Sequence, residues 1–212
     1  MNEATRLVVL RHGETDWNVG QRIQGQLDIG LNGVGRWQAG RAAAALLDEG
    51  LQAIYSSDLA RAADTAAAIS RATGLPVHPE PGLRERGFGR FEGLTFAEIQ
   101  QRWPEDALRW RRRDPDWGAE GGERLADFYG RAVAAALAIA ARHPGQTVAL
   151  VAHGGVLDCL YRAATRIALD APRTWMLGNA SINRLLHADG ALALVGWNDA
   201  GHLEGGRDDV SA

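Results

Sequence analysis

The chain has 212 residues, of which 46% are hydrophobic, so it can bury one substantial core and is expected to form a single domain over residues 1–212. Its net charge of −3 offers no basic surface for nucleic acid or an anionic membrane. All 23 positively charged residues are arginine, which excludes a Walker-type phosphate-binding lysine, a Schiff-base lysine and a Ser–Lys dyad.

Cysteine content and hydropathy set further limits. Cys159 is the single cysteine, so an internal disulfide and a Cys-X-X-Cys site are excluded, and its apolar helical surroundings indicate a packing role. The N-terminus is too charged, and its apolar run too short, for a signal peptide. No stretch reaches the ~20 apolar residues of a membrane span. We therefore expect a soluble, cytoplasmic protein.

Strand-like and helical patterns alternate along the chain. Residues 6–12, 53–56 and 147–153 are short apolar runs typical of buried strands, and residues 181–187 and 191–197 indicate a hairpin. Helices are predicted at about 34–47, from a cap at Ser57 or Asp58 to about 72, and at 96–103, 105–112, 124–142 and 154–168. The alternation predicts an α/β fold: a three-layer α/β/α sandwich with a mostly parallel central sheet.

Residues 76–122 interrupt this alternation. Residues 76–93 are rich in proline and glycine, and loops this long inside compact domains are often functional. With the two short helices that follow, they predict a lid-like insertion around residues 76–122. Four arginines lie close to the end of this insertion: Arg109, Arg111, Arg112 and Arg113. They either form a solvated helix end or recognise a second acidic group on a substrate.

Two predicted strands end in the same way, with His12 or His153 followed by glycine. If these strands are neighbours in a parallel sheet, both imidazoles emerge at the crevice beyond the carboxyl ends of the strands. The helix after His153 would direct its first N–H groups at an anion. A structural histidine is one alternative for each position. A zinc pair is another, but no His-X-His or His-X-X-X-His spacing occurs, and Arg11 would repel a cation.

Two arginines accompany these histidines. Arg11 precedes His12, and Arg61 lies in the first turn of a predicted helix, where the helix dipole disfavours a cation. Arg61 is either a surface charge or a phosphate ligand, and arginine forks match phosphate oxygens. Two histidines and two arginines indicate phosphoryl transfer through an imidazole, which also needs a proton donor for the departing alkoxide. Glu85 in a Gly-rich loop is our candidate, and its rivals are Glu14, Glu92 and Glu98.

Several short motifs occur in a fixed order across residues 6–160. They are Arg11-His12-Gly13-Glu14-Thr15 with Trp17-Asn18, Gln24-Gly25 with Asp28 and Leu31, residues 56–62 with Thr65-Ala66, Leu83-Arg84-Glu85 with Gly89 and Glu92-Gly93, and His153-Gly154-Gly155. This set resembles the signature of the histidine phosphatase superfamily, also called the phosphoglycerate mutase-like family. The resemblance implies the fold of that family and a small phosphorylated metabolite as the substrate.

The resemblance also implies roles for individual residues. His12 would be phosphorylated during turnover, and Glu85 would act first as acid and then as base. Arg11, Arg61 and His153 would bind the transferring phosphoryl group, and the remaining pocket residues would be Asn18, Gln24, Gly25 and the Gly154 amide. Members of the family need no metal, so neither a metal nor another cofactor is expected. 2,3-Bisphosphoglycerate would be needed only by a mutase.

The branch of the family is indicated by the region after the acid. Mutases carry Glu-Arg-His-Tyr-Gly and then Gly-Leu-Asn-Lys, whereas this chain has Glu85-Arg86-Gly87-Phe88-Gly89 and then Gly93-Leu94-Thr95. A Tyr and a Lys expected near the carboxylate of the substrate are therefore absent. Residues 109–117 lack the Pro-rich run of the mutases, and residues 121–123 look more like the phosphatase branch.

We therefore expect hydrolysis of small phosphate monoesters. A 2,3-bisphosphoglycerate-dependent phosphoglycerate mutase is the first alternative. A non-catalytic module that binds a phosphorylated ligand is the second, although pure binding would not need the acid Glu85.

Overall fold

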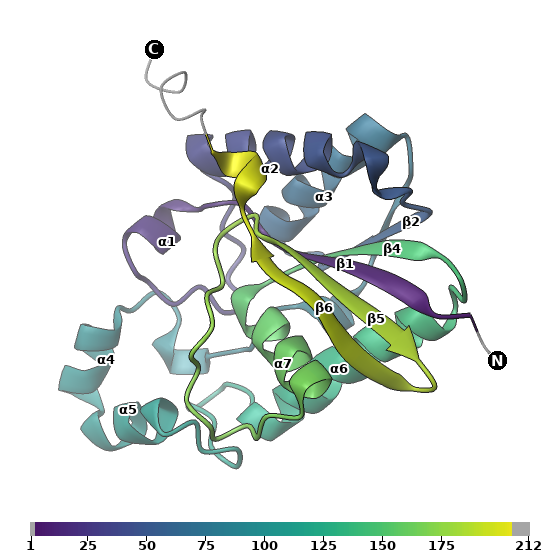
Figure 1. Cartoon of the computed structure of the whole chain (residues 1–212). Helices are drawn as coiled ribbons and strands as arrows, with labels where there is room; N and C mark the ends of the chain where they lie inside the picture. The colour runs from purple at the N-terminus through teal and green to yellow at the C-terminus, as the bar shows by residue number, and fades with distance from the viewer. Residues whose placement is uncertain (1–2, 205–212) are drawn as a thin grey trace.

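The computed structural model describes residues 3–204, and its centre is one six-stranded sheet (Figure 1). The strands lie in the order β3-β2-β4-β1-β5-β6. Their bounds are β1 Thr5–Arg11, β2 Ala53–Ser56, β3 Val77–Pro79, β4 Thr147–Ala152, β5 Ile182–Ala188 and β6 Ala191–Asp199. Strands β3, β2, β4 and β1 pair in parallel, while β5 is antiparallel to β1 and forms a hairpin with β6. The mostly parallel sheet is as predicted.

Helices cover both faces of this sheet. The α-helices of the described residues, including some that do not lie on the sheet, are α1 Asp16–Val19, α2 Gly33–Ala45, α3 Ala60–Thr73, α4 Phe96–Arg102, α5 Pro104–Arg111, α6 Leu125–Ala141 and α7 Gly154–Thr165. Alternate residues of β1 face opposite layers, because successive side chains of a strand point to opposite sides. Val8 and Leu10 pack in the core with α2 and α3, whereas Leu7 and Val9 pack in the core with α6 and α7. The three-layer sandwich is confirmed.

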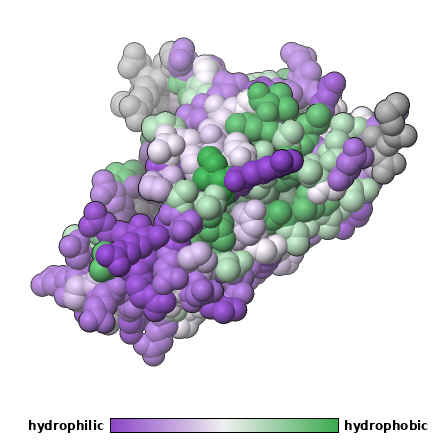
Figure 2. All heavy atoms as spheres, turned by 60° about the horizontal axis from the view of Figure 1, so that its bottom comes forward, coloured by the Kyte–Doolittle hydropathy of each residue, from purple (hydrophilic) through white to green (hydrophobic). Residues whose placement is uncertain are grey.

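Helices α4 and α5 stand apart from the sheet, and they have a small core of their own (Figure 1). Its buried members are Phe91, Ile99, Ala107, Trp117 and Ala119. Hydrophilic residues dominate this end of the molecule, at the lower left of Figure 2. The separate core shows how a segment inserted between β3 and α6 can fold without extending the sheet.

The start of α3 differs from the sequence prediction. Its N-cap is Leu59, which makes no side-chain capping hydrogen bond. Ser57 and Asp58, the two predicted caps, are held instead by distant partners: Ser57 by His153, and Asp58 by Arg84. Long-range contacts have overridden the local capping preference here.

Cys159 is 1% exposed and packs in the core on the α6–α7 side, in agreement with its predicted role. Burial raises the pKa of its thiol. No helix within residues 3–204 is both long enough and apolar enough to cross a membrane.

Candidate active site

The parallel register of β1 and β4 brings the two predicted histidines together. Arg11 and Ala152 are partners across the two strands, and the His12 amide donates to the Ala152 carbonyl at 2.9 Å. The next residue of each chain segment is therefore a histidine at the same sheet edge. The ring centroids of His12 and His153 lie 5.2 Å apart, and both side chains are buried.

His12 is held as a neutral imidazole with a free lone pair. Its Nδ1 lies 2.7 Å from the Gly13 carbonyl oxygen, which only accepts hydrogen bonds, so Nδ1 carries the hydrogen and Nε2 carries the lone pair. Burial and the charges of Arg11 and Arg61 hold the pKa of His12 well below its ordinary value of 6.5. The ring is therefore a competent nucleophile at neutral pH.

His153 is oriented by a buried hydroxyl. Its Nε2 lies 2.8 Å from Ser57 Oγ, and Ser57 Oγ also accepts a hydrogen bond from the Leu59 amide at 3.3 Å. The Ser57 hydroxyl can therefore donate to Nε2, which leaves the ring hydrogen on Nδ1. Burial, then the charges of Arg61, His12 and Arg11, hold the pKa of His153 well below its ordinary value. Within residues 3–204, Nδ1 of His153 has no partner, so it remains a buried donor.

Two guanidinium groups lie beside these rings. Arg61 is 1% exposed and donates to the carbonyls of Leu27 and Gly25, at 2.9 and 2.7 Å. Arg11 donates to the Leu177 carbonyl at 2.5 Å. In the described part of the chain the Nε atoms of both arginines are buried and unpaired. Two positive charges with unused donors therefore face the histidines, which suits an anion such as a phosphoryl group.

Gly25 shapes the loop that receives Arg61. Its φ of +52° favours glycine, and a Cβ there would lie 2.0 Å from Glu92 Oε1. Glu92 in turn accepts hydrogen bonds from the amides of Gln26 and Phe88. The carboxylate of Glu92, a rival candidate for the acid, therefore fastens two loops together.

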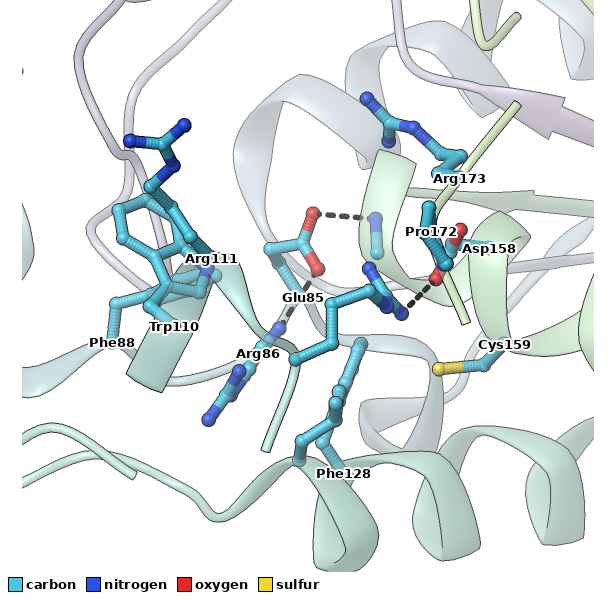
Figure 3. Close-up of a pocket in the computed structure, with 13 residues that line it drawn as sticks. Glu85, Arg86, Phe88, Trp110, Arg111, Phe128, Asp158, Cys159, Pro172 and Arg173 are labelled. Atoms are coloured by element: carbon cyan, nitrogen blue, oxygen red, sulfur yellow. Dashed lines mark hydrogen bonds and ion pairs between the residues drawn. The ribbon is translucent and has the colours of Figure 1, made fainter. Parts of the chain in front are cut away.

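The predicted acid, Glu85, lies at the N-terminus of α7. Its Oε2 accepts from the Gly155 amide at 3.0 Å, and its Oε1 accepts from the Arg86 amide at 2.9 Å (Figure 3). A Cβ on Gly155 would lie 2.1 Å from Glu85 Oε1, so the close approach requires glycine. The other two rivals are occupied elsewhere: Glu14 accepts from Asn32, and Glu98 closes the capping box of α4.

A cavity of about 250 Å³ joins these groups. Every predicted site residue except His153 lines it: Arg11, His12, Asn18, Gln24, Gly25, Arg61, Glu85 and Gly154. His153 lies against His12. Within residues 3–204, no group of three or more His, Cys, Asp or Glu side chains is placed to hold a metal ion.

Several residues at the site were not predicted. Phe88 and Arg173 also line the cavity, and Asn179 donates from its side chain to the His12 carbonyl at 3.0 Å. Ser57 was expected only as a helix cap. Arg173 and Asn179 lie in the segment between α7 and β5, where neither periodicity nor a recognised motif gave a signal. Ser57 lies inside the motif at residues 56–62, so that motif was its available signal.

The arginine cluster of residues 109–113 is not a single functional unit. Arg109 forms an ion pair with Asp114 at 2.7 Å, and Arg113 forms one with Asp158 at 2.6 Å. Arg111 packs over the Phe96 ring and lines a second cavity, of about 480 Å³, beside the first (Figure 3). Neither prediction for this cluster holds for all its members, because Arg109 has a local acidic partner, Arg113 has one distant in sequence, and Arg111 lies at the cavity.

These groups together define a site suited to phosphoryl transfer. They are a neutral imidazole nucleophile, a second imidazole, two arginines and a nearby carboxyl group. A family model described as histidine phosphatase superfamily (branch 1) matches residues 7–200. The chain therefore belongs to this superfamily, as the motifs indicated, and it is a phosphatase that acts on phosphate monoesters.

Individual relatives agree with this assignment. The chain is 42% identical over 191 residues to the glucosyl-3-phosphoglycerate phosphatase of Mycobacterium tuberculosis, covering 86% of this chain and 85% of the relative. It is 38% identical over 208 residues to a metal-independent phosphoserine phosphatase of Arabidopsis thaliana, covering 95% and 84%. Among solved structures, the YhfR protein of Bacillus stearothermophilus is 34% identical with a TM-score of 0.88, covering 94% of this chain and 100% of that chain.

Proposed function

We propose that this phosphatase hydrolyses phosphate esters of small hydroxy acids or amino acids, without a metal, through a phosphohistidine on His12. Relatives named for glucosyl-3-phosphoglycerate and phosphoserine support this substrate class. The observation that carries the mechanism is the state of His12: a neutral ring whose Nε2 lone pair lies beside two arginines.

Binding places the phosphoryl group among the unused donors. The guanidinium groups of Arg11 and Arg61, the Nδ1 hydrogen of His153 and the Gly154 amide surround its oxygens. These donors are fixed before the substrate arrives, so they stabilise the charge on the transferring group without reorganisation. Asn18, Gln24 and the loop at Gly25 complete the wall of the pocket.

In the first chemical step, Nε2 of His12 attacks phosphorus opposite the leaving oxygen. A phosphorus–nitrogen bond forms as the bond to the leaving oxygen breaks, and protonated Glu85 transfers its proton to that oxygen. The alcohol departs. The Gly13 carbonyl accepts a stronger hydrogen bond from Nδ1 as positive charge develops on the ring.

In the second step, water attacks the phosphohistidine. The Glu85 carboxylate takes the proton from this water as the new phosphorus–oxygen bond forms and the bond to Nε2 breaks. Inorganic phosphate leaves, and both His12 and Glu85 return to their starting states. The cycle consumes one ester and one water and needs no redox partner.

We also propose that the chain works as one domain, with residues 76–122 covering the pocket. Glu85 and Phe88 belong to this segment and line the reaction cavity, which supports a covering role.

The experiment is a phosphate-release assay on 3-phosphoglycerate, phosphoserine and glucosyl-3-phosphoglycerate, with and without EDTA. We expect EDTA-insensitive hydrolysis that His12→Ala abolishes, with His78→Ala, at an exposed histidine, as the matched control. An alkaline quench should preserve phosphate on the peptide that contains His12. A wild-type rate that depends on added metal, or activity that survives in His12→Ala, contradicts the proposal. Interconversion of 2- and 3-phosphoglycerate on addition of 2,3-bisphosphoglycerate, with little release of phosphate, would instead support the mutase.

A further inference from the structure

A second cavity, of about 480 Å³, opens beside the reaction cavity. The two cavities share four lining residues: Glu85, Phe88, Gly155 and Arg173. Because Glu85 is the proposed proton donor to the leaving oxygen, the space beyond it lies on the leaving-group side of the phosphorus. The second cavity is therefore where the rest of the ester would lie, and its lining decides which alcohols fit.

Two of the four arginines that line this cavity are already engaged. Arg86 donates to the backbone carbonyls of Glu123 and Trp117, and Arg113 is paired with Asp158. The other two are Arg111 and Arg173, and neither forms an ion pair in the part of the chain that the structure describes. Both are exposed at the opening, and Figure 3 shows them on opposite sides of Glu85. These are positive charges that the fold itself leaves without a carboxylate.

The backbone that precedes Arg173 is anchored by buried polar contacts. Arg162 is buried and donates to the carbonyls of Ala168 and Ala171, while Arg113 donates to the Leu169 carbonyl. Asp158 binds both of these arginines through the same oxygen, Oδ2. This network ties the turn before Arg173 to α7 and to the end of α5. Arg173 is therefore presented at the boundary of the two cavities from an anchored backbone.

The remaining walls strengthen any ion pair made there. Phe88, Trp110, Leu125 and Phe128 line the cavity and reduce the water around a bound group. Coulombic attraction grows as the surroundings lose water, and a guanidinium fork binds a carboxylate through two parallel hydrogen bonds. Arg11 and Arg61 already serve the phosphoryl group, so a further arginine at this boundary suits a second anionic group on the same substrate.

We propose that Arg173, with Arg111 on the opposite wall of the cavity, binds a carboxylate on the leaving group and makes the enzyme selective for phosphorylated acids. This inference rests on the proposed hydrolysis at His12 and adds to it the residues that select the substrate. Recognition of the carboxylate is thereby assigned chiefly to Arg173, in the segment between α7 and β5. Arg111 is the single member of the 109–113 cluster that contributes.

The test compares esters that differ in the carboxylate: 3-phosphoglycerate against glycerol 3-phosphate, and phosphoserine against phosphoethanolamine. Arg173→Gln should lower kcat/KM for the two acids by about 10- to 100-fold, the range of a charge-assisted hydrogen bond. It should change kcat/KM for the two esters without a carboxylate by less than about 3-fold. Arg111→Gln should act in the same direction. The matched controls are Arg166→Gln and Arg112→Gln, at exposed arginines on the same two segments.

Charge reversal provides a second, independent readout. Arg173→Glu should lower kcat/KM for phosphoserine further and raise that for phosphoethanolamine relative to wild type, because a carboxylate attracts the free ammonium group. Equal losses on all four esters in Arg173→Gln would place Arg173 in the phosphoryl site and overturn the inference. If Arg173→Gln leaves kcat/KM for all four esters unchanged, the inference is overturned as well. Hydrolysis by the wild-type enzyme would still support the proposed function. A wild-type enzyme that hydrolyses neither these four esters nor glucosyl-3-phosphoglycerate would overturn both the proposed function and this inference.

Discussion

Ser57 Oγ lies 2.8 Å from Nε2 of His153, and both side chains are fully buried. The two residues come from different strand ends, β2 and β4, which are neighbours in the sheet. If the hydroxyl donates to Nε2, the ring hydrogen lies on Nδ1, which has no partner within residues 3–204 and would be available to a phosphoryl group. We therefore expect Ser57 to act as a positioning residue for the reaction.

Ser57→Ala should remove the hydrogen bond between the Ser57 hydroxyl and Nε2 of His153. His153 would then also populate the tautomer without a hydrogen on Nδ1, and kcat/KM should fall by roughly 10-fold or more. Steady-state kinetics across pH 5 to 8 will measure the loss and any shift of the acid limb. Ser56→Ala is the matched control, because Ser56 is also buried and its hydroxyl donates to the Ser57 carbonyl and not to His153. Equal losses in the two variants would mean that the effect comes from packing.

Glu85→Gln should reveal the role of the acid through the leaving group. An amide cannot donate a proton to the departing oxygen, so alkyl esters should lose about 10²- to 10⁴-fold in kcat. p-Nitrophenyl phosphate, whose leaving group needs little protonation, should lose much less. Glu14→Gln, at a carboxylate that bonds to Asn32, is the comparison. A uniform loss on both kinds of ester in Glu85→Gln would argue against general acid catalysis.

Gly155→Ala tests the close approach of α7 to Glu85. The added Cβ would lie 2.1 Å from Glu85 Oε1, so the carboxylate must move away from the leaving oxygen. We expect kcat to fall by at least 10-fold. The thermal midpoint should also fall modestly, because the added Cβ would lie 3.1 Å from Cε1 of the buried Phe128, which has less room to move than the Glu85 carboxylate. Gly130→Ala in α6 is the control, since a Cβ there meets open space and should stabilise the helix slightly. Retained activity in Gly155→Ala would contradict the placement of Glu85.

The two buried histidines also make stability depend on pH. The pKa values of His12 and His153 lie well below 6.5 in the folded protein. Below pH 6.5 the unfolded chain therefore binds protons at these two histidines that the folded chain does not bind. Their contribution to stability is complete above about pH 6.5 and is lost as the pH falls towards the folded pKa values. Each histidine should contribute a slope of up to about 1.4 kcal/mol per pH unit in this window.

Urea denaturation at pH 5 to 8 in phosphate-free buffer will measure this slope. His12→Asn should have a shallower dependence of unfolding free energy on pH than the wild type has, and the exposed histidine His78 provides the matched control as His78→Asn. A slope that His12→Asn leaves unchanged would show that His12 does not resist protonation in the folded state.

Much of the fold and site could be predicted because their signals are local. A buried strand that ends in histidine and glycine is readable at residues 6–13 and again at 147–154. Each α-helix except the four-residue α1 was located to within a few residues, whereas α1 was not predicted. The catalytic candidates His12, His153, Arg61 and Glu85 all lie within such local motifs. The structure brings them together because parallel strands place their carboxyl ends at one edge.

The sequence by itself determined the class of chemistry and supplied the candidate residues for it, since strand, turn and glycine patterns depend on neighbours along the chain. Only the tertiary structure decided the hydrogen-bond partner of His153, the division of the 109–113 cluster and the place of Arg173 at the boundary of the two cavities. These depend on hydrogen-bond and ion-pair partners that lie far apart in the chain: Ser57 with His153, and Arg113 with Asp158. The packing of the layers decides which group a polar side chain bonds to. No pattern among neighbouring residues in the sequence identifies that group.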